Sequence, residues 1–102
     1  MNNEQQHKWI NDGRQLGIRF SFIRNGNLYW SSIGIQKWGD LIKVYVDEIL
    51  ESEMDAENYS REELLEFSNV DNALKFISEN TIVNIENLKP CKGQKIFNPE
   101  FR

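Results

Sequence analysis

An asparagine–glycine pair, Asn25-Gly26, separates two segments that have the composition of β-strands. Residues 16–24 (LGIRFSFIR) alternate apolar and polar side chains, which is the period of a half-buried strand. Residues 28–35 (LYWSSIGI) are rich in the aromatic and β-branched residues that favour strands. Asn-Gly readily adopts the positive φ angles of a tight turn. The sequence therefore predicts a β-hairpin over residues 16–35, so the fold must contain an antiparallel sheet.

The length of 102 residues suits one domain and leaves little room for two. We therefore expect a single domain over residues 1–102. Aromatic residues make up 12% of the chain, a share that argues against intrinsic disorder. No apolar run approaches the ~20 residues that cross a bilayer, and the polar N-terminus does not look like a signal peptide. With one cysteine, Cys91, and hence no internal disulfide, these features predict a cytoplasmic protein.

Two segments after the hairpin fit both a strand and a helix. Residues 38–40 (WGD) are expected to interrupt the regular secondary structure. Residues 41–50 fit either a helix capped by Asp40 or a strand. The β-branched residues in this segment favour a third strand. Residues 51–58 are acidic and predict an exposed loop or a frayed turn. Residues 61–67 remain open between a short strand and a helix, because Ser, Arg, Glu and Glu at 60–63 have the spacing of a capping box.

A helix over about residues 69–80 is the clearest helix in the chain. Either Ser68 or Asn69 can cap it. Its apolar residues recur at i, i+3, i+4 and i+7, and they are Val70, Ala73, Leu74 and Ile77. Residues 81–85 fit a last strand, and residues 2–10 fit a short N-terminal helix. The tail, residues 88–102, is expected to be an ordered coil that is pinned by Ile96, Phe97 and Phe101.

These segments together predict an α+β fold. Its sheet is small and antiparallel, a meander that starts with the hairpin at 16–35, and one or two helices pack against it. The helix at about 69–80 covers one face of the sheet, and the other face stays partly open.

Residue types that usually carry catalysis are sparse. The one histidine, His7, lies in a polar terminal stretch. A Cys91 nucleophile would need a nearby base, and His7 is the only histidine that could serve. No cysteine or histidine pair has zinc spacing, and Asp47, Glu51 and Asp55 lack the glycine and the alternating ligands of a calcium loop. The glycines are dispersed and form no phosphate-binding loop. We therefore expect a protein that is not an enzyme, without catalytic or metal-binding residues or a cofactor.

Acidic residues are concentrated in the middle of the chain. Residues 47–66 contain nine acidic residues and one basic residue, a net charge of −8. Residues 1–46 carry six basic against three acidic residues, and residues 88–102 carry four against one, so each flank has a net charge of +3. The simplest interpretation is a solvated loop that keeps the protein soluble. The functional interpretation is a surface that attracts a basic partner protein and speeds its association.

The functional interpretation names a set of contact residues. Tyrosines at the edges of the acidic segment, Tyr45 or Tyr59, supply the aromatic burial that is enriched in binding hot spots. We predict that the partner contacts Asp47, Glu48, Glu51, Glu53, Asp55, Glu57, Tyr59 and Glu62.

Nucleic-acid binding is the alternative. In the hairpin between Arg14 and Trp30, arginines are interleaved with aromatic residues, a pattern that can stack bases and neutralise phosphates. A small single-stranded nucleic-acid-binding module would use this hairpin. The net charge of −4 argues against it, and the aromatic residues also suit a hydrophobic core.

A resemblance to a known class of proteins rests on two segments in the last third of the chain. They are residues 67–77 (FSNVDNALKFI) and residues 88–99 (LKPCKGQKIFNP). With the size and acidity of the chain, they resemble bacterial immunity proteins that neutralise polymorphic toxins, including those of contact-dependent growth inhibition systems. The resemblance implies stoichiometric inhibition of one cognate toxin, commonly a nuclease, in the cytoplasm of the producing cell. These families share no invariant site, so no residue role is carried over. We predict an immunity protein whose acidic patch occludes the basic active-site surface of its toxin.

Overall fold

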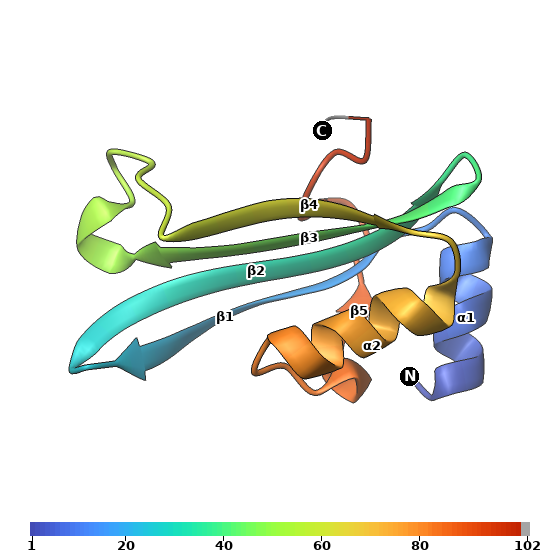
Figure 1. The fold of residues 1–102 in the computed structure, drawn as a ribbon, viewed down its shortest axis with the longest axis horizontal. Helices are drawn as coiled ribbons and strands as arrows, with labels where there is room; N and C mark the ends of the chain where they lie inside the picture. The colour runs from blue at the N-terminus through green and yellow to red at the C-terminus, as the bar shows by residue number, and fades with distance from the viewer. Residues whose placement is uncertain (101–102) are drawn as a thin grey trace.

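In a computed structural model that describes residues 1–100, the chain forms a five-stranded antiparallel sheet with two helices packed on it (Figure 1). The strand order is β4-β3-β2-β1-β5. The helices and strands are α1 (Asn3–Asn11), β1 (Leu16–Arg24), β2 (Asn27–Trp38), β3 (Leu41–Leu50), β4 (Arg61–Phe67), α2 (Val70–Asn80) and β5 (Lys89–Pro90), with short 3₁₀ helices η1 (Glu51–Glu53) and η2 (Ile85–Asn87). The predicted α+β fold is confirmed.

The predicted hairpin is confirmed as β1 and β2. Its register pairs Leu16 with Ile35 and Arg24 with Asn27. The turn has positive φ angles at Asn25 (52°) and Gly26 (77°), the conformation that this residue pair adopts at low cost. β2 continues past the predicted end as far as Trp38, and a second tight turn at residues 39–40 leads into β3.

The hydrophobic core lies between one face of the sheet and α2. Across β2 and β3, Ile33 faces Val46 and Ile35 faces Val44, and all four side chains are buried. The α2 residues with helical spacing are all buried against them: Val70, Ala73, Leu74 and Ile77. Asn69 caps the helix, with its side chain accepting a hydrogen bond from the Asn72 N–H at 2.8 Å. This predicted helix is therefore confirmed, and so is the short helix at the N-terminus.

Two ambiguous segments prove to be strands. Residues 41–50 form β3, as the β-branched residues indicated, and residues 61–67 form β4. The helical alternative for 61–67 is wrong, because the whole segment pairs with β3 from Arg61, opposite Glu48, to Phe67, opposite Ile42. The last strand predicted at 81–85 is also wrong. There the Thr81 hydroxyl accepts a hydrogen bond from the Val83 N–H, and the chain turns into η2.

The tail crosses the face of the sheet opposite α2. Gln15 holds it, since its side-chain oxygen accepts hydrogen bonds from the N–H groups of Ile96 (2.6 Å) and Phe97 (3.4 Å). The Gln15 side-chain amide also donates to the Phe97 carbonyl at 2.9 Å. The predicted anchors Ile96 and Phe97 are thus in place, whereas Phe101 lies outside the described residues. The short strand β5 within the tail was not predicted.

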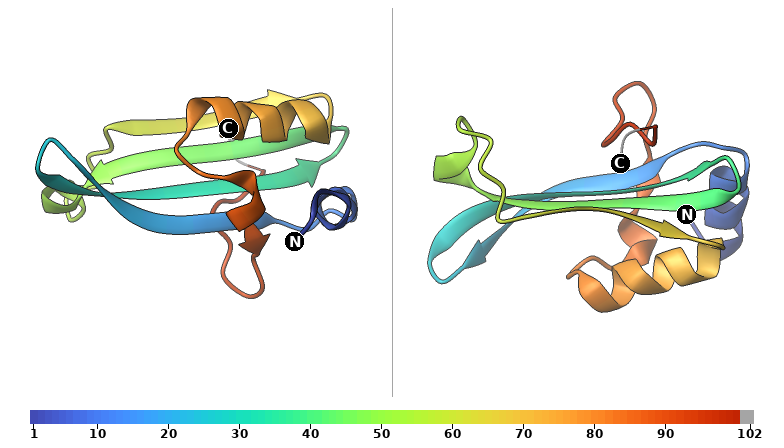
Figure 2. Two further views of the ribbon diagram at one scale, coloured as in Figure 1. Left: turned by 90° about the horizontal axis from the view of Figure 1, so that it is seen from below. Right: turned by 45° about the horizontal axis from the view of Figure 1, so that its top comes forward.

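Two segments rise from the same side of the sheet, away from α2 (Figures 1 and 2). One is the loop at residues 54–60 that follows η1, and the other is the tail at residues 94–98. They leave part of this open face uncovered between them. Within residues 1–100, no helix is long and apolar enough to cross a membrane.

Candidate functional site

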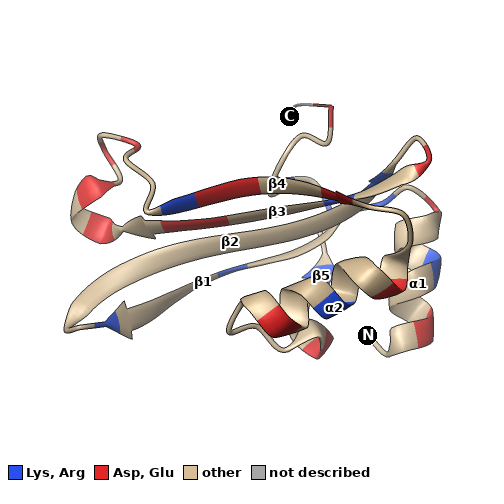
Figure 3. Ribbon diagram, in the orientation of Figure 1, with Lys and Arg blue, Asp and Glu red and all other residues tan. Residues whose placement is uncertain are grey.

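The uncovered part of the open face lies between the loop at residues 54–60 and the tail at residues 94–98. Alternate residues of the strands point toward it, because opposed residues of an antiparallel pair share one face. β2 contributes Trp30 and Ser32, opposite Ile49 and Asp47 of β3, and Asp47 in turn lies opposite Glu62 of β4. We call this surface the acidic saddle and define it by Trp30, Ser32, Tyr45, Asp47, Tyr59 and Glu62. Figure 3 shows the acidic residues gathered at this end of β3 and β4.

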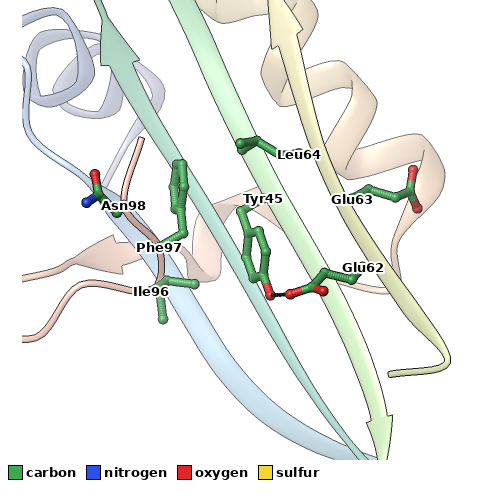
Figure 4. A pocket seen from close by; sticks show the side chains of 7 residues that line it. All are labelled: Tyr45, Glu62, Glu63, Leu64, Ile96, Phe97 and Asn98. Atoms are coloured by element: carbon green, nitrogen blue, oxygen red, sulfur yellow. Dashed lines mark hydrogen bonds between the residues drawn. The ribbon is translucent and has the colours of Figure 1, made fainter. Parts of the chain in front are cut away.

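A phenol between two carboxylates forms the floor of the acidic saddle. The Tyr45 hydroxyl donates to Glu62 Oε2 at 2.7 Å (Figure 4). It also lies 3.1 Å from Asp47 Oδ2. The Ser32 N–H donates to Asp47 Oδ1 at 2.7 Å. This network fixes both carboxylates and the ring before any partner arrives, so little side-chain entropy remains to be lost on binding.

The floor is only partly solvated, and this alters its acidity. Asp47 is 7% exposed, and burial raises the pKa of its carboxyl above the ordinary value, against the opposing effect of the hydrogen bonds from Ser32 and Tyr45. Burial also raises the pKa of the Tyr45 hydroxyl, and the hydrogen bond to Glu62 adds to the shift. The phenol therefore stays protonated and remains a donor to the carboxylates.

A hollow of about 430 Å³ lies beside this network, against the tail. Its lining includes Tyr45, Glu62, Leu64 and Phe97, and the ring of Phe97 stacks on that of Tyr45 with centroids 5.7 Å apart. The hollow thus combines aromatic faces with a carboxylate (Figure 4). Such a lining suits a cationic side chain, whose charge pairs with the carboxylate while its stem packs on the rings.

Two large aromatic side chains stand at the outer rim. Trp30 and Tyr59 are each 38% exposed, which is high for residues of this size. The Trp30 indole donates to Glu51 Oε1 at 3.3 Å. Burial and the charges of Asp47, Glu62 and Glu57 raise the pKa of Tyr59, so the Tyr59 ring lies within the field of the acidic saddle.

The structure brings together five of the eight predicted contact residues. Asp47, Tyr59 and Glu62 form part of the acidic saddle, with Glu57 acting on Tyr59 and Glu51 bonded to Trp30.

The other three predicted residues lie elsewhere. Glu48 points to the helix-covered face and pairs there with Arg24 (3.0 Å) and Arg61 (3.8 Å). Glu53 accepts a hydrogen bond from Asn58 within the loop, and Asp55 is exposed at the loop's turn.

Sequence reasoning missed Trp30, Leu64 and Phe97 as members of this site. Trp30 carried a signal, since the alternation of β2 places it on the face opposite to Tyr29. Phe97 carried only the signal of an apolar residue in a polar tail. Its position over Gly34 depends on contacts between distant parts of the chain, with the nearest ring carbon 2.7 Å from where a Cβ would stand.

The arginines of the hairpin diverge from one another. Arg24 lies on the helix-covered face above Phe22 (4.9 Å) and Tyr29 (5.3 Å), whereas Arg19 lies on the open face beside Ser32. Arg14 stacks on Trp9, outside the sheet. The three arginines that motivated the nucleic-acid interpretation therefore do not form one continuous surface.

Within residues 1–100, no group of three or more histidine, cysteine, aspartate or glutamate side chains is arranged to hold a metal ion. Comparisons of the chain with protein-family models, with curated proteins and with solved structures found no match.

Proposed function

We propose that this protein is an immunity-type inhibitor that binds a cognate bacterial toxin domain and covers its basic active-site surface with the acidic saddle. The toxin is commonly a nuclease, and inhibition takes place in the cytoplasm of the producing cell. The observation that carries the proposal is the combination, on one open face of the sheet, of carboxylates that form no ion pair within residues 1–100 with the exposed aromatic rings of Trp30 and Tyr59.

Charge supports the proposal. Of the nine acidic residues at 47–66, Glu48, Glu63 and Glu66 form ion pairs. The other six (nine minus three) have none within the described part of the chain. Their field is therefore available to a basic partner, and a field of this kind raises association rates by about 10- to 1,000-fold at low ionic strength. In a nuclease groove, such carboxylates take the place of substrate phosphates.

The aromatic rim supports the proposal in a second way. Tryptophan and tyrosine at the centre of an interface contribute about 2 kcal/mol or more each when a partner buries them. Trp30 is oriented by its hydrogen bond to Glu51. Charges that steer a partner and rings that retain it are the two components that a tight, stoichiometric inhibitor needs.

The proposal requires a gene for a basic toxin domain beside this one, and the test uses that domain. Replacing Glu51, Glu57 and Glu62 together with lysine should slow association by about tenfold or more at low salt, because these three exposed carboxylates belong to the acidic saddle or adjoin its aromatic rim and steer the encounter. The free energy of unfolding should change by less than about 1 kcal/mol, since exposed charges add little to stability. Stopped-flow association and urea unfolding measure the two effects.

Glu79→Lys is the matched control. Glu79 is exposed on α2, on the other side of the sheet, so the same type of charge reversal there should leave association within about twofold of the wild type. Equal association rates for the triple variant and the wild type at low salt would exclude the acidic saddle as the contact surface. Absence of binding to the wild type would exclude this toxin as the partner.

A further inference from the structure

A second hollow, of about 420 Å³, lies on the far side of the tail from the first hollow, at the edge formed by β1 and β5. Ile96 lines both hollows, so the tail forms a ridge between them. Three cationic side chains line this second hollow: Arg19, Lys89 and Lys92. Among the described residues, no aspartate or glutamate lines it. We call it the basic pocket.

The cations of the basic pocket come from separate segments that the fold holds together. Arg19 projects from β1, and Lys89 belongs to β5, which pairs with β1 at Gly17. Cys91 follows β5 and directly precedes Lys92. It is held in place as well, because the Cys91 N–H donates to the Gln15 carbonyl at 3.0 Å. The pocket is therefore a built part of the fold, and its charges do not depend on one flexible loop.

Gly17 and Cys91 make up the floor. A Cβ at Gly17 would stand 2.6 Å from the Ile96 side chain and 3.1 Å from Cys91 Sγ, so only glycine lets the tail approach this closely. Burial raises the pKa of the Cys91 thiol, against the charges of Arg19 and Lys95, which favour the thiolate. The thiol stays neutral and does not offset the positive charge of the pocket.

We propose that the basic pocket binds a phosphate group. Arg19 lies near the Asp47 carboxylate of the acidic saddle, whereas Lys89 and Lys92 form no ion pair within residues 1–100. Three lining cations therefore favour a multiply charged anion over a single carboxylate, because a monoanion would leave much of the positive charge uncompensated. An arginine matches two phosphate oxygens at once, and lysines act as point charges beside it. The volume suits a phosphate ester as well as the free ion, since small-molecule sites begin at about 300 Å³.

Amide NMR spectra of the intact protein, titrated with inorganic phosphate at constant ionic strength, test the proposal. Saturable shifts are expected at residues 17–19 and 89–94. Arg19→Gln and Lys92→Gln should each weaken binding by about fivefold or more, because each removes one charge-assisted contact. Arg24→Gln removes the same charge on the other face of the sheet and should leave the affinity within about twofold.

Two further titrations identify the source of the phosphate. Tighter binding of adenosine monophosphate than of a single-stranded oligonucleotide without terminal phosphates assigns the pocket to small phosphate esters. The reverse order, at the same residues, assigns it to a polynucleotide backbone. The proposal is overturned if the shifts do not saturate, if acetate produces the same shifts, or if Arg19→Gln binds phosphate as well as the wild type. None of these results depends on a toxin, so the proposal stands or fails independently of the inhibitor function.

Discussion

Gly34 determines how closely the tail can approach the sheet. A Cβ at this position would stand 2.7 Å from Phe97 Cδ1 and 3.1 Å from Ile96 Cβ, closer than side-chain carbons pack. Since Phe97 stacks on Tyr45, the same contact also positions one wall of the hollow beside the acidic saddle. A glycine in the middle of β2, where a side chain would otherwise favour the strand, is thus explained by packing.

Gly34→Ala should therefore destabilise the protein by about 1–3 kcal/mol, because the ring of Phe97 must move to make room for the methyl group. Urea unfolding measures the change. In a Phe97→Ala background the ring is gone, and the same substitution at Gly34 should cost much less. Equal costs of Gly34→Ala in both backgrounds would show that the contact with Phe97 does not matter.

The sequence alone did not show which face of the sheet each acidic residue occupies. Asp47 and Glu48 are neighbours in an acidic run, yet β3 sends Asp47 to the acidic saddle and Glu48 to an ion pair on the opposite face. Alternation separates such neighbours, but only once the segment is known to be a strand. Because residues 41–50 also fitted a helix, the sequence could not divide the acidic residues between two faces.

Among the helices, strands and turns, the sequence predicted those that form through interactions between residues close together in the chain. The turn at Asn25-Gly26 and the apolar stripe of α2 are properties of neighbouring residues, and both were found as expected. β4 is different, because its capping-box pattern at residues 60–63 is overruled by pairing with β3 along the whole strand. The tail is a coil held by long-range contacts, so its path could not be derived from local propensity.

The tail depends on Gln15 more than on any regular element. This buried side chain bonds to the backbone of Ile96 and Phe97 and also donates to Gln36 Oε1 at 2.9 Å. A polar group left without its partner in such a position costs about 1–3 kcal/mol. One side chain thus fixes the ridge between the two hollows of the open face.

Gln15→Leu should destabilise the protein by about 2–4 kcal/mol, because the Ile96 N–H and the Phe97 carbonyl lose their partner. Hydrogen exchange at the amides of Ile96 and Phe97 should become much faster, while exchange in the core of β2 changes less. Gln94→Ala, an exposed substitution in the same tail, is the control and should alter neither. Unchanged exchange at Ile96 in Gln15→Leu would contradict the role assigned to Gln15.

The two faces of the sheet have different roles. α2 covers one face and supplies the core, so the other face is free to carry charge (Figure 2). On that open face the tail separates the hollow beside the acidic saddle from the basic pocket at the β1–β5 edge, while Arg19 of the basic pocket donates to Ser32 of the acidic saddle. Although the chain has a net charge of −4, its negative and positive charges thus lie on different parts of the open face. Such a separation orients a charged partner as well as attracting it.

Charge and aromatic contacts should also separate in the kinetics of binding. Substituting Trp30 with alanine removes a side chain that is expected to be buried by the toxin, but it leaves the net charge unchanged. Dissociation should therefore accelerate by about tenfold or more, with little change in the association rate. Trp38 provides an unusually close control, because it lies on the same strand and the same face and is 41% exposed against 38% for Trp30. It stands at the other end of β2, away from the acidic saddle, so Trp38→Ala should dissociate at the wild-type rate. If Trp38→Ala had the larger effect, the toxin would be bound at the opposite end of the sheet.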